Sequence, residues 1–233
     1  MANNRVKFHY TISFQDGRNQ EFLIELDPDS LALLSPPQEN HPDWTRLACS
    51  RCPNCPLNPQ EHTHCPIALN LAPAIDKFAR NISYEEVNVT IQTQARDYRQ
   101  KISLQNALRS LFGIYMVTSG CPVMDPLRPL VLTHLPFATM EETSYRVLSM
   151  YMLAQFFIKK NGGKPDWEFK NLGKIYQEVE TVNQAFHKRL GQAHLEDASL
   201  NAIGNLNCYA QFTQMLLEPG NLKRIEKLFA AYL

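Results

Sequence analysis

The sequence lacks several features that would assign it to a functional class directly. Glycine is scarce, with 9 in 233 residues. There is no glycine-rich phosphate loop, no Gly-x-Ser-x-Gly elbow and no His-Glu-x-x-His motif. Positive and negative residues balance at 23 each, and no run of Lys and Arg would follow phosphates or an anionic membrane surface. Composition therefore gives no support to a nucleic-acid or membrane-surface partner.

Long apolar runs are also absent. The most apolar stretch, 147–158, is interrupted by Ser149 and Gln155 and is shorter than the ~20 residues of a membrane-spanning helix. No apolar stretch follows Arg5, so no secretory signal is visible. These absences predict a cytoplasmic protein. In that compartment, closely spaced cysteines bind metals or carry out redox chemistry more often than they form structural disulfides.

The first part of the chain has the alternating pattern of β-strands. Residues 5–14 and 20–26 alternate and flank an Asp-Gly pair, which predicts an antiparallel hairpin. Residues 85–93 and 98–102 predict a second hairpin. Between the hairpins, a proline-bearing connector at 35–43 can continue neither a strand nor a helix.

Helical spacing of apolar residues appears in both parts of the chain. A helix is expected between 66 and 81, kinked or divided at Pro73, and a second is expected to begin after Ser103 and to stop at Gly120. Two amphipathic helices and a final short helix are expected after residue 170. The fold class is therefore α+β: two antiparallel β-hairpins with short helices, followed by an all-α half. We divide the chain into parts 1–120 and 121–233, which could also form one compact domain.

A capping box, Thr139-x-x-Glu142, opens a helix from 140 to 160 that is apolar on nearly every side. We expect it to be the most buried helix. Core positions would then be Leu148, Met152, and Phe156 or Phe157. Glu142 and Arg146 are four residues apart at its start. They could line a ligand site, although a simple pair between neighbouring helical turns is the plainer interpretation.

The informative feature is a cluster of cysteines. Cys49, Cys52 and Cys55 are spaced three residues apart, Cys65 follows, and Cys121 returns much later. Thiolates are preferred ligands of zinc and of iron–sulfur clusters, and a two-residue gap lets two sulfurs bind one ion from a tight turn. Four of these cysteines precede a proline, which fixes the backbone beside the ligand: Cys52, Cys55, Cys65 and Cys121. We expect these four to bind one metal ion, with Zn²⁺ the first choice.

Three histidines and one further cysteine are substitute ligands. Cys49, His62 or His64 could replace one thiolate, because imidazole binds zinc equally well. The spacing does not match a zinc knuckle, and each of the two histidines also fits a solvent-facing loop. His134, on the crossover that follows the last cysteine of the set, could bind or support the metal, or could pack beside Pro136.

Two other chemistries fit parts of the cluster. The three cysteines within 49–55 match the first steps of a ferredoxin-type [4Fe–4S] motif, but a fourth does not follow within a few residues. A thiol-redox site needs its Cys-x-x-Cys at the start of a helix, whereas prolines place loop on both sides of this pair. Unliganded thiols are the remaining alternative. Cys208 lies in an apolar helical stripe and is expected to be a small buried hydrophobe.

Several short motifs together resemble an uncharacterised bacterial family with a domain of unknown function. They are Cys-Pro-x-Cys-Pro-Leu at 52–57, His-Cys-Pro at 64–66, Ser-Gly-Cys-Pro at 119–122, His-Leu-Pro-Phe-Ala-Thr at 134–139 and Glu-Glu-Thr-x-Tyr-Arg at 141–146. The family pattern has no cysteine at the place of Cys49. The resemblance therefore favours the set of four cysteines that precede proline, and it implies no activity, cofactor or catalytic residue.

The sequence thus predicts a metal-binding protein of unknown activity. Four thiolates would leave no open position for water and would over-neutralise a divalent ion, so we expect a closed, structural zinc site. The alternative is an iron–sulfur redox protein or enzyme that uses the same cysteines. The sequence identifies no partner and leaves a homo-oligomer open.

Overall fold

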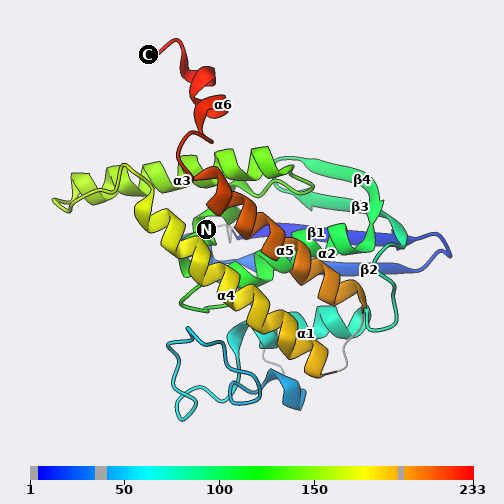
Figure 1. The fold of residues 1–233 in the computed structure, drawn as a ribbon. Helices are drawn as coiled ribbons and strands as arrows, with labels where there is room; N and C mark the ends of the chain where they lie inside the picture. Colours follow the sequence, from blue (N-terminus) through cyan, green and yellow to red (C-terminus); the bar gives the residue numbers. More distant parts are fainter. Residues whose placement is uncertain (1–4, 35–40, 194–196) are drawn as a thin grey trace.

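The computed structural model describes residues 5–34, 41–193 and 197–233 (Figure 1). Its four strands form one antiparallel sheet in the order β2-β1-β3-β4. The strands are β1 (Val6–Phe14), β2 (Asn19–Leu26), β3 (Glu86–Thr93) and β4 (Asp97–Ser103). Both predicted hairpins are confirmed. Gly17, at a φ of +88°, supplies the left-handed residue of the first turn.

The two hairpins join through their first strands. β1 pairs with β3 from Phe8 opposite Thr93 to Phe14 opposite Val87. Alternate residues of β1, β2 and β3 are buried on one face: Phe8, Tyr10, Ile12, Phe14, Phe22, Ile24, Leu26, Val87, Val89 and Ile91. β4 is an edge strand with a largely polar, exposed sequence, which protects the edge against pairing with another chain.

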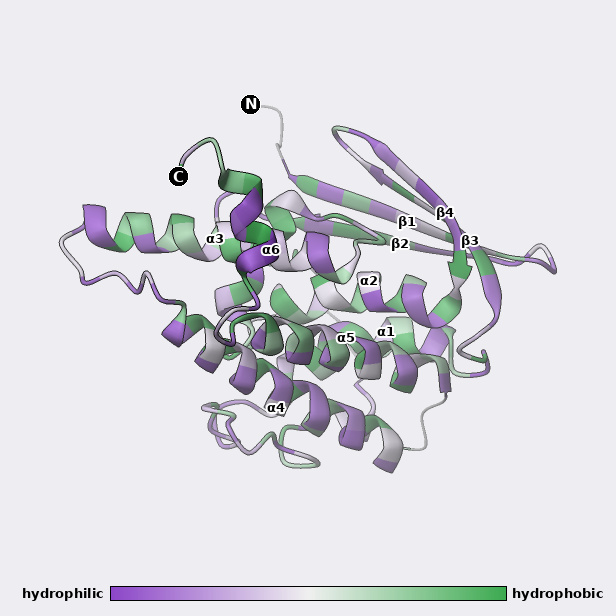
Figure 2. Cartoon of the chain, turned by 45° about the horizontal axis from the view of Figure 1, so that its top comes forward, coloured by the Kyte–Doolittle hydropathy of each residue, from purple (hydrophilic) through white to green (hydrophobic). Residues whose placement is uncertain are grey.

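Helices occupy one side of the sheet (Figures 1 and 2). They are α1 (Pro66–Lys77), α2 (Leu104–Val117), α3 (Met140–Lys160), α4 (Lys170–Gln192), α5 (Asp197–Leu216) and the short α6 (Lys223–Glu226). Short 3-10 helices lie at η1 (Asp43–Thr45), η2 (Asp125–Thr133) and η3 (Lys227–Phe229). α2 packs against β3 and β4 and also against α5, and α5 packs against α4. The α+β class is confirmed: α1 lies between the two hairpins in the chain, and only helices follow β4.

The structure tests where the predicted helices begin and end. α1 runs unbroken through Pro73 as a single helix and ends at Lys77. α2 stops before Gly120, which has a φ of +86°. The capping box forms as predicted, with Thr139 Oγ1 accepting from the Glu142 amide and the Glu142 carboxylate accepting from the Thr139 amide. The connector expected at 35–43 lies mostly outside the described residues.

The prediction that α3 is buried on all sides is wrong. Leu148 is buried, at 7% exposed, but Phe156 and Phe157 are 52% and 48% exposed, and Met152 is only partly buried. The 21-residue helix is about 31 Å long, and its last turns extend beyond the other helices (Figure 1). Only one stripe, from Ser144 to Gln155, faces the protein.

Cys208 is also placed differently from the prediction, since its side chain is exposed on α5. Within the described residues, no helix combines the length and apolar character needed to cross a membrane. Buried side chains from both parts of the chain share one hydrophobic cluster. The division at residue 120 stays a prediction.

Candidate metal centre

Two of the four predicted ligands stand at the ends of helices. Cys65 is the N-cap residue of α1, with Pro66 at the first helical position. α2 ends at Val117, and Cys121 comes four residues later. Gly120, just before it, has a left-handed backbone that turns the chain away from the helix. Because α1 and α2 pack against each other, two positions far apart in sequence can meet beside them. Both thiols are buried, at 6% and 7% exposed.

The other two predicted ligands share one turn. The Cys55 amide donates to the Cys52 carbonyl, with an N–O distance of 3.1 Å. The Arg51 guanidinium donates to the Cys55 carbonyl at 2.7 Å. Both thiols are half-buried and pack against the hydrophobic core. The Cys-Pro-x-Cys-Pro segment therefore forms the short turn that its spacing predicted.

The four thiols are close enough for each to affect the ionisation of the others. Burial, followed by the charges of its three partners in the predicted set, raises the pKa of the Cys52 thiol to about 12. Burial also raises the pKa of Cys65 and that of Cys121. Cys55 contributes to both of these shifts, and Cys65 contributes to that of Cys121. Every pair among the four predicted ligands thus interacts electrostatically.

Backbone amides oppose the effect of burial at two of these thiols. Burial is the larger influence on Cys65, but the amides of Ala68 and Ile67 lower its pKa. Two amides of the turn after Cys121 have the same effect on that thiol. The N–H groups at these turns carry partial positive charge, which favours thiolates.

The four sulfurs are not drawn together at metal-bonding distances. Among residues 5–34, 41–193 and 197–233, no three His, Cys, Asp or Glu side chains are grouped so that they could hold a metal ion. Zinc bonds of ~2.3 Å place tetrahedral sulfurs about 3.8 Å apart. Neutral thiols gain little by approaching so closely. The arrangement is therefore one of four neighbouring thiols that would have to move inward to bind one ion.

A buried arginine lies beside the thiols. Arg189 of α4 is only 2% exposed, and its charge lowers the pKa of Cys52 and of Cys65. Its guanidinium donates three hydrogen bonds to backbone carbonyls, at 2.6 Å to Trp44, 2.7 Å to Arg46 and 2.5 Å to Ser50. No carboxylate pairs with it within the described part of the chain. A buried cation held only by carbonyls favours negative charge nearby.

Polar contacts hold the first half of the segment 43–65 to α4. Besides the carbonyl contacts of Arg189, the Asn54 side-chain amide donates to the Glu178 carbonyl and carboxylate of α4, at 2.9 and 2.5 Å. The segment also closes on itself, since the Leu47 amide donates to the Thr63 carbonyl at 2.9 Å. Apart from η1 the segment contains no helix or strand. These contacts and its thiols are what position it below α4 and beside α1 (Figure 1).

Three of the substitute ligands, Cys49, His62 and His64, do not lie where they would complete a metal site. Cys49 and His62 are exposed. His64 Nδ1 is hydrogen-bonded to Thr45 Oγ1 at 2.8 Å, and burial, followed by the charges of His41 and Arg46, lowers its pKa. No thiol contributes to that shift.

His134 lies in a different environment. Its Nε2 is hydrogen-bonded to Tyr10 Oη at 2.7 Å, within 3.4 Å of Ser110 Oγ. Burial and then the charge of Arg146 lower its pKa, and no cysteine contributes. The interpretation of His134 as a loop residue packed beside Pro136 misses this buried contact with the sheet.

Arg189 is the residue that sequence reasoning missed. The signal was available, because Arg189 falls three residues after Phe186 on the stripe of α4 that also contains Val179 and Val182, and all four are buried. A charged residue on the core-facing stripe of a helix needs partners there. The identity of those partners, carbonyls of a segment about 140 residues earlier, could not be read from the sequence.

Comparisons with known proteins give one match. A family model described as a domain of unknown function, DUF6901, matches residues 8–230. No curated protein and no solved structure matches the chain.

Proposed function

We propose that this chain, which belongs to the DUF6901 family of unknown function, binds one zinc ion through Cys52, Cys55, Cys65 and Cys121. The ion closes a structural site. It fixes the segment 43–65 to the start of α1 and to the end of α2, and so ties the loop to the helical body. No activity is assigned to the site.

The observation that carries this proposal is the mutual interaction of the four thiols. Every pair within the set affects the ionisation of its members, and the cysteines outside the set, Cys49 and Cys208, are exposed. The four thiols come from three separate segments and lie beside the hydrophobic core, two of them buried and two half-buried. Each is followed by proline, which stiffens the backbone beside the ligand.

Charge gives a second line of support. Four thiolates around Zn²⁺ carry a net charge of −2, which is costly to bury without a nearby cation. Arg189 supplies that cation from α4 and is held in place by three carbonyls of the same loop. Without metal the raised pKa values keep these thiols protonated, whereas binding to zinc would convert them to thiolates, because a coordinating thiol is deprotonated outright. The metal and Arg189 would then stabilise the loop from two sides.

A closed site is expected to be structural. Catalytic zinc keeps one position open for water and uses three protein ligands, whereas four cysteines fill the tetrahedron. Binding free energy at such a site contributes to folding. We place the protein in the cytoplasm, where thiols stay reduced. We also take the motifs around its Cys-Pro pairs to be those of a bacterial family.

Metal analysis of the purified chain tests the proposal. We expect one zinc ion per chain by mass spectrometry, released by a chelator with a fall in melting temperature. Cys121→Ser and Cys65→Ser should each lose the metal and melt earlier, while the matched controls Cys49→Ser and Cys208→Ser should retain both metal and stability. A Cys121→Ser chain that stayed fully metal-loaded would contradict the four-cysteine set.

The same preparation decides the identity of the metal. An anaerobic sample with brown absorbance near ~400 nm and bound iron would replace zinc by an iron–sulfur cluster at these cysteines. A chain without metal, whose stability did not respond to added zinc, would leave only unliganded thiols and would overturn the proposal.

A further inference from the structure

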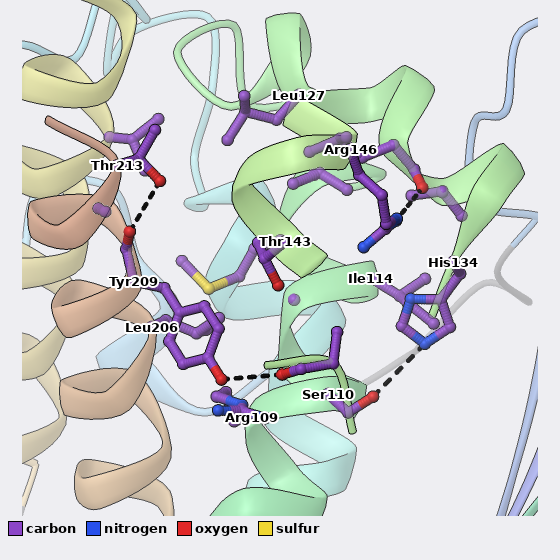
Figure 3. Close-up of a pocket in the computed structure, with 18 of the residues that line it drawn as sticks. Arg109, Ser110, Ile114, Leu127, His134, Thr143, Arg146, Leu206, Tyr209 and Thr213 are labelled. Atoms are coloured by element: carbon purple, nitrogen blue, oxygen red, sulfur yellow. Dashed lines mark hydrogen bonds between the residues drawn. The ribbon is translucent and has the colours of Figure 1, made fainter. Parts of the chain in front are cut away.

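A pocket lies in the helical part of the protein, separate from the cysteines. It is lined by residues of α2, η2, α3, α4 and α5 and has a volume of about 170 Å³. Figure 3 shows its lining. Most of the surrounding side chains are apolar, among them Ile114, Met124, Leu127, Val131, Phe137 and Leu206. An apolar pocket with few polar groups is the usual form of a small-molecule site.

One cation faces this apolar surface. Arg146 is partly buried near the start of α3, and its Nη2 donates to the Leu130 carbonyl at 2.8 Å. Its Nε is buried without a hydrogen-bond partner. Within the described residues, no ion pair joins Glu142 to Arg146, because the Glu142 carboxylate caps α3. Burial lowers the pKa of Arg146, although a guanidinium stays charged at neutral pH.

A second lining residue has unused hydrogen-bonding capacity. Asn183 of α4 is 2% exposed, and its Oδ1 has no hydrogen-bond partner. A buried amide oxygen without a partner costs roughly 1–3 kcal/mol, so it matches a ligand that carries a donor. The other arginine of the lining, Arg109, is occupied differently, with its guanidinium stacked 4.3 Å above the ring of Tyr209.

We propose that this pocket binds a small monocarboxylic acid with an aromatic or branched aliphatic body. The carboxylate would pair with the Arg146 guanidinium, and the body would lie against the apolar lining. A hydroxyl on the body would be matched by Asn183. The size agrees, because a cavity of about 150 Å³ with a similar lining accommodates benzene. The pocket therefore suits a molecule about as large as benzoate.

The surroundings argue against a more highly charged ligand. Among the lining residues, Arg146 is the one cation with a buried, unpartnered donor. No glycine-rich loop is present in the sequence. Phosphate groups are usually bound by several cations or by the amides of a helix N-terminus. A carboxylate requires only the single fork of a guanidinium.

Titration of the intact chain with four probes tests this inference. Calorimetry or amide NMR would follow benzoate, 4-hydroxybenzoate, benzyl alcohol and phenyl phosphate. We expect saturable binding of benzoate, tighter binding of 4-hydroxybenzoate, and at least about tenfold weaker binding of benzyl alcohol, which lacks the charge. This comparison uses the wild-type chain and does not depend on any variant folding. Tighter binding of phenyl phosphate than of benzoate, or no saturable binding of either acid up to about 10 mM, would overturn the inference.

Two variants and a matched control locate the site. Arg146→Met should weaken benzoate at least about tenfold and leave benzyl alcohol nearly unchanged. Asn183→Leu should abolish the preference for 4-hydroxybenzoate over benzoate. Arg128 is the control: it also contacts a backbone carbonyl, that of Ser30, and pairs with Asp125 of η2, but it does not line the pocket. Equal loss of benzoate binding in Arg128→Met and Arg146→Met would show that Arg146 acts only by supporting the fold.

Discussion

Replacement of Arg189 by Met removes the contact that joins α4 to the cysteine segment. Three carbonyls, those of Trp44, Arg46 and Ser50, lose their donor. Hydrogen bonds from a charged donor each contribute roughly 1.5–3 kcal/mol, but the apolar Met side chain escapes the cost of burying a charge. Each buried carbonyl left without a donor costs roughly 1–3 kcal/mol, so for three of them we expect a net loss of about 3–5 kcal/mol in the free energy of unfolding.

The loss of stability in Arg189→Met should be larger when zinc is bound. With zinc bound, Arg189 also faces a site of net charge −2, so the variant should weaken zinc binding as well as the fold. Without zinc only the carbonyl contacts are lost, and the effect on stability should be smaller. Urea unfolding followed by circular dichroism, with and without a chelator, measures both quantities, and competition with a colorimetric zinc chelator measures the affinity.

A matched control separates this effect from the general effect of removing an arginine. Arg99 lies on the edge strand β4, has a side chain 74% exposed and reaches Asp97 only at 3.8 Å. Arg99→Met should leave unfolding and zinc affinity unchanged. If Arg189→Met behaved like Arg99→Met in both assays, the reasoning that Arg189 positions the loop and balances the thiolate charge would be refuted.

Other predictions concern the fold around the site. Leu148→Ala should cost about 2–5 kcal/mol of unfolding free energy because the side chain is buried, whereas Phe157→Ala, at a half-exposed position, should cost clearly less; equal losses in urea unfolding would contradict the burial pattern of α3. Gly120→Ala, at a φ of +86°, should cost about 1–3 kcal/mol and slow zinc uptake, and a fully stable variant would show that the turn before Cys121 tolerates a side chain. Burial lowers the pKa of His134 in the folded state, so the unfolded state binds a proton first as the pH falls below about 6.5, and stability should decrease by up to about 1.4 kcal/mol per pH unit. Because His134 is only partly buried, the measured slope should lie below that limit, and a His134→Gln variant should lose this share of the pH dependence.

Local chemistry made much of the fold readable from the sequence. Gly17 after Asp16 indicated the first hairpin, Thr139 and Glu142 indicated the start of α3, and Gly120 indicated the end of α2. Each of these signals acts within four residues along the chain. Backbone preferences and capping hydrogen bonds over such distances do not depend on what the rest of the protein does.

The burial of α3 could not be read in the same way. A helix with apolar residues on nearly every side predicts burial all round, but the sequence does not show how far its neighbours extend. Phe156 and Phe157 are exposed because the helix is longer than the surface against which it packs. Similarly, Cys208 belongs to an apolar helical stripe but is exposed on α5.

The same distinction between local and long-range determinants applies to the candidate site. The sequence by itself predicted the set of four Cys-Pro units, Cys121 included, and the turn between Cys52 and Cys55, because both are visible as residue types and short spacings in the chain. Only the tertiary structure decided that the charge of Arg189 reaches Cys52 and Cys65 and that His134 contacts Tyr10 of the sheet. Those neighbours come from segments far apart in the chain. Their proximity follows from the packing of α1, α2 and α4, which no short pattern in the sequence specifies.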